Sequence, residues 1–403
     1  MDLKSGYPWW AVKNGLMHAF PRLERDLRCD VAIVGGGITG ALVADEFARH
    51  GHEVAVLEQR DIGWGSSAVS TALLQYEIDT HMVDLSRRYG EDAAALAYRS
   101  CAAAIDLLGE RAARVRGAGY RRTRSLYYAS KPRHRGVLLE EFGLRAKHGL
   151  DVAWLDAGEI RARHGFDAPC AILSRQAAQV DPYRFATRLL QSVEKAGGGV
   201  FDRCPVDGIE TGDRGVVLRV AGGARVRARH VVLAAGYATQ HWLDQRVARN
   251  RSSYAFVTDP LDRDVLGALR GTMLWETARP YLYARTTDDD RLLVGGEDDS
   301  VDIPARRDGR VDGKARKLAK AFGKLFPALP LEPTFAWAGT FAETADGLPF
   351  FGPHPQHGPR VHFAMAYGGN GITYSELGAG LLRALVERRR HPLERLFGFG
   401  RLR

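Results

Sequence analysis

The sequence predicts a mixed α/β fold in which a parallel-sheet domain is interleaved with an antiparallel-sheet domain. The first observation is a short apolar strand at residues 31–34 that leads into a glycine turn, a helical stretch and a second strand at residues 54–57. The second is the return of similar strand-and-helix segments in the middle and at the end of the chain, with alternating strands between them. The predicted domains are 1–85, 176–245 and 331–403 for the parallel sheet, and 86–175 and 246–330 for the antiparallel sheet, which would bind the substrate.

The individual elements follow from periodicity and from capping residues. Residues 86–116 are alanine-rich and helix-like, and Asp181-Pro182 is placed to open another helix. Residues 281–296 alternate around an acidic turn, which predicts a hairpin. The other expected elements are strands at 125–130, 216–220, 224–229, 231–236 and 361–366, and helices at 183–196, 314–326 and 372–388.

The first strand–turn–helix segment has the spacing of a dinucleotide site. Gly35, Gly37 and Gly40 form G-x-G-x-x-G. The first glycine permits a tight turn, the second lets the backbone approach a pyrophosphate, and the third lets helix and strand pack closely. The helix that follows begins at Ile38 and Thr39, where free N–H groups and a partial positive charge suit an anion.

An acidic residue completes this segment. Glu58 follows the second strand, about 20 residues after the glycines, where a carboxylate accepts hydrogen bonds from ribose hydroxyls. The same carboxylate would repel a 2′-phosphate, so we do not expect an NADP-type ligand. Gln59 and Arg60, which come next, are included in the predicted cofactor site.

The composition is that of a globular protein. The chain has 403 residues, of which 45% are hydrophobic and 26% are charged. No apolar run approaches the roughly 18 residues of a membrane span, and residues 1–21 have no apolar signal region. The four cysteines lie far apart, which fits neither a zinc site nor a disulfide framework, so no metal site is expected. The cytoplasm is the expected location.

The net charge of +9 comes mainly from arginine, since only nine of the 57 basic residues are lysines. A solvated, arginine-rich surface is the simplest explanation. Attraction to anionic substrates, to a membrane surface or to RNA remains open. Nucleic acid is not the expected partner, because few aromatic residues are interleaved with the basic clusters.

Glycine-rich motifs outside the first segment identify a family resemblance. They are Gly65-Ser66-Ser67, Ala235-Gly236, Trp337-Ala338-Gly339 and Gly369-Asn370-Gly371-Ile372-Thr373. With the first turn, they resemble the D-amino acid oxidase superfamily of FAD-dependent oxidoreductases, and most closely its glycine oxidase, sarcosine oxidase and γ-glutamylputrescine oxidase group. The resemblance covers about residues 30–385. It implies a Rossmann-like FAD-binding domain of the glutathione reductase type.

The resemblance implies an extended FAD site. The last turn would aim a helix N-terminus at the flavin edge where negative charge accumulates on reduction. FAD is expected to be noncovalent, because residues 61–80 contain no histidine and no cysteine follows Cys204. The predicted cofactor residues are Gly35, Gly37, Ile38, Thr39, Gly40, Glu58, Gln59, Arg60, Gly65, Ser66, Ser67, Val206, Ala235, Gly236, Gly339, Gly369, Asn370, Gly371, Ile372 and Thr373.

The resemblance also implies a reaction, the oxidation of a carbon–nitrogen bond in a small amine or amino acid. Hydride would pass to flavin N5, the imine would be hydrolysed, and electrons would pass to O₂ or to another acceptor. Arg285 is the predicted carboxylate anchor. Tyr254, Tyr283 and Gln75 are the other predicted substrate-side residues. No lysine lies between Lys195 and Lys314, where some relatives place one to speed reaction with oxygen, so oxidase and dehydrogenase both remain open.

Other functions compatible with these motifs remain as alternatives. One is a tRNA-modifying flavoprotein whose basic surface holds RNA, and another is a membrane-surface dehydrogenase that reduces quinone. A noncatalytic FAD-stabilised scaffold is the least favoured. The sequence does not predict the oligomeric state.

Overall fold

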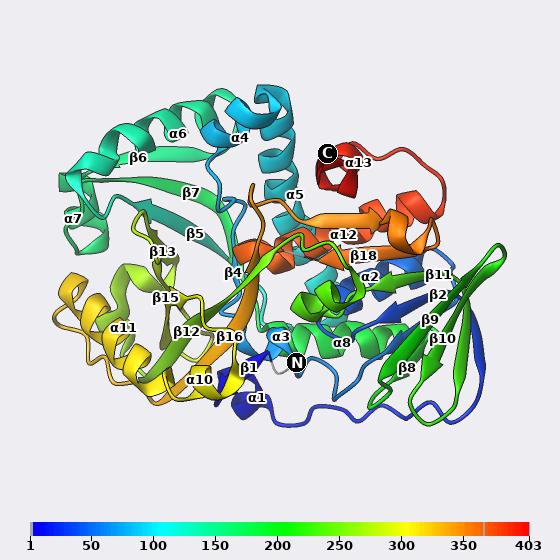
Figure 1. The fold of residues 1–403 in the computed structure, drawn as a ribbon. Coiled ribbons are helices and arrows are strands. Elements are labelled where there is room, and N and C mark those ends of the chain that lie inside the picture. Colours follow the sequence, from blue (N-terminus) through cyan, green and yellow to red (C-terminus); the bar gives the residue numbers. More distant parts are fainter. Residues whose placement is uncertain (1–2, 366, 403) are drawn as a thin grey trace.

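The computed structural model describes residues 3–365 and 367–402, and these residues form an eight-stranded and a ten-stranded sheet with helices around them (Figure 1). None of the helices formed by these residues combines the length and the hydropathy that crossing a membrane requires.

The eight-stranded sheet is parallel at its centre. The parallel strands lie in the order β18, β11, β2, β3, β8, and β17 pairs with β18 in the antiparallel direction. An antiparallel pair, β9 and β10, extends from β11. The bounds are β2 Leu27–Val34, β3 Val54–Leu57, β8 Gly199–Phe201, β9 Val206–Gly212, β10 Gly215–Val220, β11 Arg225–Leu233, β17 Phe350–Pro353 and β18 Val361–Met365.

Strand β2 is buried on both faces, as expected for a central parallel strand. Val31 and Ile33 pack in the core that contains the helices. Ala32 and Val34 pack on the opposite face, with residues of β10 and β11. The helices of the first face are α2 Ile38–Arg49, α5 Glu91–Val115, α8 Pro182–Lys195 and α12 Gly371–Val386.

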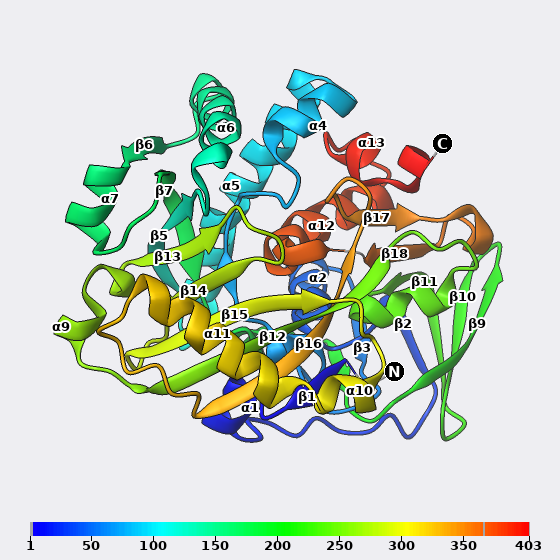
Figure 2. The same cartoon turned by 60° about the vertical axis from the view of Figure 1, so that its left-hand side comes forward.

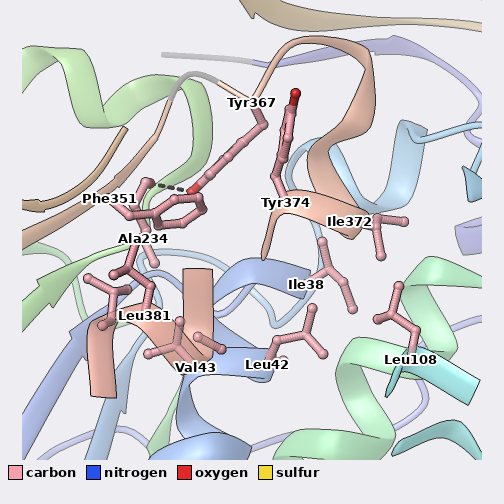
Figure 3. Packing of buried hydrophobic residues seen from close by; sticks show 14 of the residues in the cluster. Ile38, Leu42, Val43, Leu108, Ala234, Phe351, Tyr367, Ile372, Tyr374 and Leu381 are labelled. Atoms are coloured by element: carbon pink, nitrogen blue, oxygen red, sulfur yellow. Dashed lines mark hydrogen bonds between the residues drawn. The ribbon is translucent and has the colours of Figure 1, made fainter. Parts of the chain in front are cut away.

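Packing between α2, α12 and α5 fixes the position of two glycine turns. Figure 3 shows Ile38 of α2 close to Ile372 of α12, with Leu42 of α2 and Leu108 of α5 on the same side of the cluster and Leu381 of α12 on its other side. All five side chains are buried, and burying one such side chain contributes roughly 1.5–3 kcal/mol. Because α2 and α12 both begin at a glycine turn, this core holds the two turns at a fixed separation.

The ten-stranded sheet is antiparallel, except that β13 runs parallel to β5. Helix α11 packs across β12, β15 and β16 on one face of it (Figure 2). The strand bounds are β1 Lys4–Gly6, β4 Leu73–Leu74, β5 Arg121–Tyr128, β6 Val152–Asp156, β7 Cys170–Gln179, β12 Arg249–Pro260, β13 Thr272–Glu276, β14 Leu282–Thr286, β15 Arg291–Asp299 and β16 Phe335–Glu343. The remaining helices are α1 Trp9–Asn14, α3 Ser66–Val69, α4 Met82–Tyr89, α6 Arg135–Lys147, α7 Ala157–His164, α9 Arg263–Leu266, α10 Pro304–Asp308, α11 Val311–Leu325 and α13 Glu394–Phe397.

Most predicted elements are present. The hairpin is β14 and β15, and the predicted cap of α8 is confirmed, since the Asp181 side chain accepts from the Arg184 N–H at 2.9 Å. Two predictions were wrong. The helix expected over 86–116 is two helices, α4 and α5, because Gly90 between them has a φ of +89° that no α-helix contains. The separate strands expected at 224–229 and 231–236 are one strand, β11, which pairs with β2 along most of its length.

Three strands of the ten-stranded sheet come from segments that the sequence assigned to the parallel-sheet domain. They are β1, β4 and β16, and β16 pairs with β12 over nine residue pairs. The two sheets are therefore connected through shared segments of the chain. The boundaries of the two domains stay a prediction.

Candidate cofactor and substrate site

A cavity of about 600 Å³ extends from the Gly35 turn to the ten-stranded sheet. Its volume lies in the range of roughly 300–1,000 Å³ that is usual for ligand sites. Both sheets contribute to its lining, together with the N-termini of α2, α3 and α12. The cavity therefore joins the predicted cofactor motifs to the predicted substrate domain.

The first glycine turn has the backbone that the motif predicts. Gly35 has a φ of +115°, and a side chain there would collide with the carbonyl oxygen of Ala234. A side chain at Gly40 would collide with the carbonyl oxygen of Gly35, so α2 can approach β2 only with glycine at this position. The Ile38 N–H donates to Ser67 Oγ at 2.8 Å, which ties the start of α2 to α3. The turn presents the helix N-terminus to the cavity.

Glu58 is held at the end of β3 by two backbone hydrogen bonds. Oε2 accepts from the Gly36 N–H at 2.7 Å, and Oε1 accepts from the Arg60 N–H at 2.9 Å. Burial raises the pKa of Glu58, while these two hydrogen bonds oppose the rise. Each carboxylate oxygen keeps a second lone pair, so the group can still accept from ribose hydroxyls.

The segment at Gly65 and the end of β11 add further positions with space beside the backbone. The Ser66 hydroxyl is buried and has no hydrogen-bond partner among the described residues. Around Gly65 and Gly236, an added Cβ would meet no atom within 4 Å, so the backbone is open on that side. A buried hydroxyl without a partner, next to open backbone, fits a ligand that carries phosphate oxygens.

The last glycine turn is bound to the segment 75–79. Asn370 Nδ2 and Thr373 Oγ1 donate to backbone carbonyl oxygens of this segment at 2.7 and 3.1 Å. The Gly369 N–H donates to Asp79 Oδ2 at 2.9 Å. These contacts hold the N-terminus of α12 at the cavity wall.

All the predicted cofactor residues except Gly40 line this one cavity, including Gln59, Val206, Ala235, Gly339, Gly371 and Ile372. Gly40 lies behind the turn and has the packing role that the motif gives it. The residues present fit FAD, because an anion-binding helix start, a carboxylate and an unpartnered hydroxyl lie along the same cavity. The assignment of individual residues as FAD ligands stays a prediction.

Three of the four predicted substrate-side residues line the other end of the cavity. Tyr283 and Gln75 are held by hydroxyl groups of Ser253 and Ser125, each at 3.0 Å. Tyr254 lines the cavity as well, but its hydroxyl donates to Asp299 at 3.2 Å. Among the described residues that line the cavity, none is a lysine.

Arg285 does not line the cavity, so its predicted role as a carboxylate anchor was wrong. Its side chain is 2% exposed, and its guanidinium donates to the backbone carbonyl oxygens of Thr71 at 2.6 Å and Val180 at 3.0 Å. Burial lowers its pKa to about 9. Tyr283 and Arg285 share a face of β14, but Arg285 lies two residues further along the strand, where the segments around Thr71 and Val180 cover it.

Several cavity residues were missed by sequence reasoning. They are Asp79, Trp275, Arg279 and Asp298, and none belongs to a motif. Trp275 stacks on Tyr127 with ring centroids 3.6 Å apart, in a core that neighbours the cavity. The only sequence signal was the aromatic content next to the predicted hairpin.

Comparison with known proteins agrees with this geometry. Gamma-glutamylputrescine oxidoreductase of Escherichia coli (strain K12) is 27% identical, over 98% of this chain and 91% of that protein. Glycine oxidase of Geobacillus kaustophilus (strain HTA426) is 28% identical, over 90% of this chain and 94% of that protein. The crystal structure of glycine oxidase from Geobacillus kaustophilus superposes with a TM-score of 0.77 at 23% identity, covering 92% of this chain and 98% of that one.

The model of the family described as FAD dependent oxidoreductase matches residues 30–385. This span contains the first glycine turn, the hairpin of the ten-stranded sheet and the last glycine turn. Because the match includes most of the chain, the protein belongs to the FAD dependent oxidoreductase family of the D-amino acid oxidase superfamily, and it is an FAD-dependent enzyme.

Proposed function

We propose that this protein oxidises a carbon–nitrogen bond of an amine or amino acid, using noncovalently bound FAD. The observation that carries the proposal is the single cavity that joins the glycine turns to the aromatic end of the ten-stranded sheet. The relatives named for γ-glutamylputrescine and for glycine support a substrate with such a bond.

On the cofactor side, the residues of the chain would bind FAD and fix its orientation. The N-terminus of α2 at Gly37 and the Ser66 hydroxyl would hold the pyrophosphate of FAD, and Glu58 would accept from its ribose. The N-terminus of α12 carries a partial positive charge, which would favour an anionic ligand group beside it. Hydride acceptance is the chemistry that FAD supplies when bound.

On the substrate side, the chain positions the amine and excludes water. Trp275 and Tyr283 contribute aromatic surface to the lining, and Gln75 and Ser253 contribute polar groups. Tyr254 lines the cavity too, but its ring packs in the core on the α11 side of the sheet. Orientation of the reacting carbon against the cofactor lowers the barrier without a strong base, once the amine is deprotonated. Hydrolysis of the released imine completes the reaction.

The electron acceptor is O₂ or another acceptor such as a quinone. The cavity has no lysine among its described lining residues, which supports keeping the dehydrogenase alternative. Anaerobic reduction followed by mixing with O₂ or with a quinone analogue separates the two. Rapid reoxidation with release of H₂O₂ indicates an oxidase, and reoxidation by the quinone alone indicates a dehydrogenase.

The first test is the cofactor itself. The purified protein should be yellow, and its bound flavin should be released as FAD on denaturation. Amines and amino acids are then screened anaerobically for bleaching of the flavin band, which reports reduction whatever the acceptor is. A colourless protein that cannot be reconstituted with FAD would refute the proposal.

A further inference from the structure

We propose that the substrate is an alkyl amine that binds as a cation, with its ammonium group at Asp298, and that amino acids with an α-carboxylate are disfavoured. This inference rests on the proposed function, and it names the substrate class of the same cavity. It follows from the unpartnered carboxylate oxygen of Asp298, from aromatic walls and from the position of the arginines.

Asp298 lies near the end of β15 and lines the cavity. Its Oδ1 is buried and accepts no hydrogen bond from the described residues. Burial raises the pKa of Asp298 to about 6, a hydrogen bond with Ser253 and the charge of Arg279 lower it, and the charges of Asp79 and Glu343 raise it. The carboxylate is therefore mainly ionised at neutral pH, and an ammonium group would supply the missing donor. Before hydride loss the ammonium proton would pass to this carboxylate, which leaves the neutral amine that the reaction requires.

Glu77 is a second cavity residue without donors. Its side chain is 4% exposed, and neither carboxylate oxygen accepts a hydrogen bond within the described part of the chain. The nearest cation is Arg145, whose Nη1 is 3.8 Å from Glu77 Oε1, but Arg145 donates to Glu141 at 2.8 Å. Burial raises the pKa of Glu77 and the charge of Arg145 opposes the rise, so the negative charge that the cavity offers to a cation rests on Asp298.

The aromatic side chains complete a site for an alkyl ammonium ion. Trp275 and Tyr281 meet edge to face with centroids 5.8 Å apart, and the Tyr283 hydroxyl lies 3.0 Å from Ser253 Oγ. All three rings line the cavity. Aromatic faces attract cations and also pack against an alkyl chain, so both parts of such a substrate have a partner.

The arginines do not favour a substrate carboxylate. Arg285 lies outside the cavity and is bound to backbone carbonyls. Arg279 lines the cavity, but its guanidinium lies 3.6 Å from the Tyr281 ring centroid and donates to the Asp79 carbonyl oxygen at 2.8 Å. A carboxylate at Arg279 would lie close to the Asp79 and Asp298 side chains, which repel it.

The experiment compares pentylamine with norleucine, which is the same amine with an added α-carboxylate. Anaerobic reduction of the FAD-loaded enzyme gives an apparent Kd for each compound. The Asp298→Asn variant should raise the apparent Kd of pentylamine roughly tenfold or more, because a hydrogen-bonded charge is lost. It should raise the apparent Kd of norleucine less, because the lost charge also repels the α-carboxylate. Glu297→Gln is the matched control, since Glu297 adjoins Asp298, pairs with Lys314 and does not line the cavity.

Calorimetry with tert-pentylamine provides a readout without turnover, because this amine has no hydrogen on the carbon that bears nitrogen. Its binding should weaken in Asp298→Asn and stay unchanged in Glu297→Gln. The inference is overturned if norleucine binds more tightly than pentylamine and this binding is lost in Arg279→Ala. It is also overturned if the enzyme responds to neither pentylamine nor tert-pentylamine. A protein that binds FAD but fails these tests refutes the substrate class alone, whereas failure to bind FAD refutes the proposed function.

Discussion

His362 should make the protein lose stability in mild acid. It lies on β18 with 2% of its surface exposed, and its Nε2 is 3.2 Å from Nδ1 of His230 on β11. Its Nδ1 has no partner among the described residues. Burial, with a smaller effect from His230, lowers the pKa of His362 to about 3. These two strands end at the Gly236 and Gly368 turns, so the pair lies in the sheet that carries two turns of the cavity wall.

The sign and the magnitude follow from linkage. A histidine in the unfolded chain titrates near pH 6.5, whereas His362 in the folded protein stays neutral down to about pH 3. Below about pH 6.5 the unfolded state therefore binds a proton that the folded state does not, and the free energy of unfolding falls as the pH falls. At about pH 5 the difference is about 1.5 pH units, which corresponds to about 2 kcal/mol.

The assay is urea denaturation of the wild type and His362→Gln at about pH 7.5 and about pH 5, in the same FAD state. The variant keeps a hydrogen-bonding amide beside His230, and groups that do not contact His362 titrate equally in both proteins, so the wild type should lose about 2 kcal/mol more than the variant. His18→Gln is the control, because the His18 imidazole is partly exposed. Its loss of unfolding free energy between the two pH values should equal that of the wild type. Equal losses in wild type and His362→Gln would refute the reasoning.

Three further predictions concern the site. Gly35→Ala should abolish retention of FAD, because the added side chain would collide with the Ala234 carbonyl oxygen. The control is Gly51→Ala, which should retain FAD, since Gly51 also has a positive φ but an added Cβ there meets no atom within 4 Å. Flavin absorbance per protein measures retention in both variants. Arg285→Met should reduce the free energy of unfolding by roughly 2–4 kcal/mol, because buried carbonyls lose their donors, and it should change the apparent KM of an amino acid and of an amine equally. Acid precipitation should leave all flavin in the supernatant, and flavin that remains with the pellet would contradict noncovalent binding.

The cofactor half of the cavity was predictable because its determinants are local. The turn at Gly35, the helix start at Ile38 and the carboxylate of Glu58 lie within one strand–helix–strand segment, so their relative positions follow from standard geometry. The limits of the helices and strands show the same principle. Segments with clear capping or turn residues were predicted well, whereas Gly90 was missed because a glycine within a helical pattern does not reveal its φ.

The substrate half was decided by contacts between distant segments. Asp79, Trp275 and Asp298 come from three separate parts of the chain, and only the sheet order brings them to one cavity. Arg285 shows the reverse case, because its hairpin was predicted but the segments that cover its side chain were not.

The family, the cofactor and the two kinds of sheet follow from the sequence alone, because glycine spacing, helix starts and strand alternation are properties of short segments. Which charged side chains line the cavity depends on how distant segments pack. A charged side chain on a strand pairs with whatever packs over that strand. Arg285 donates to backbone carbonyl oxygens, whereas Asp298 lines the cavity and its buried Oδ1 has no partner among the described residues.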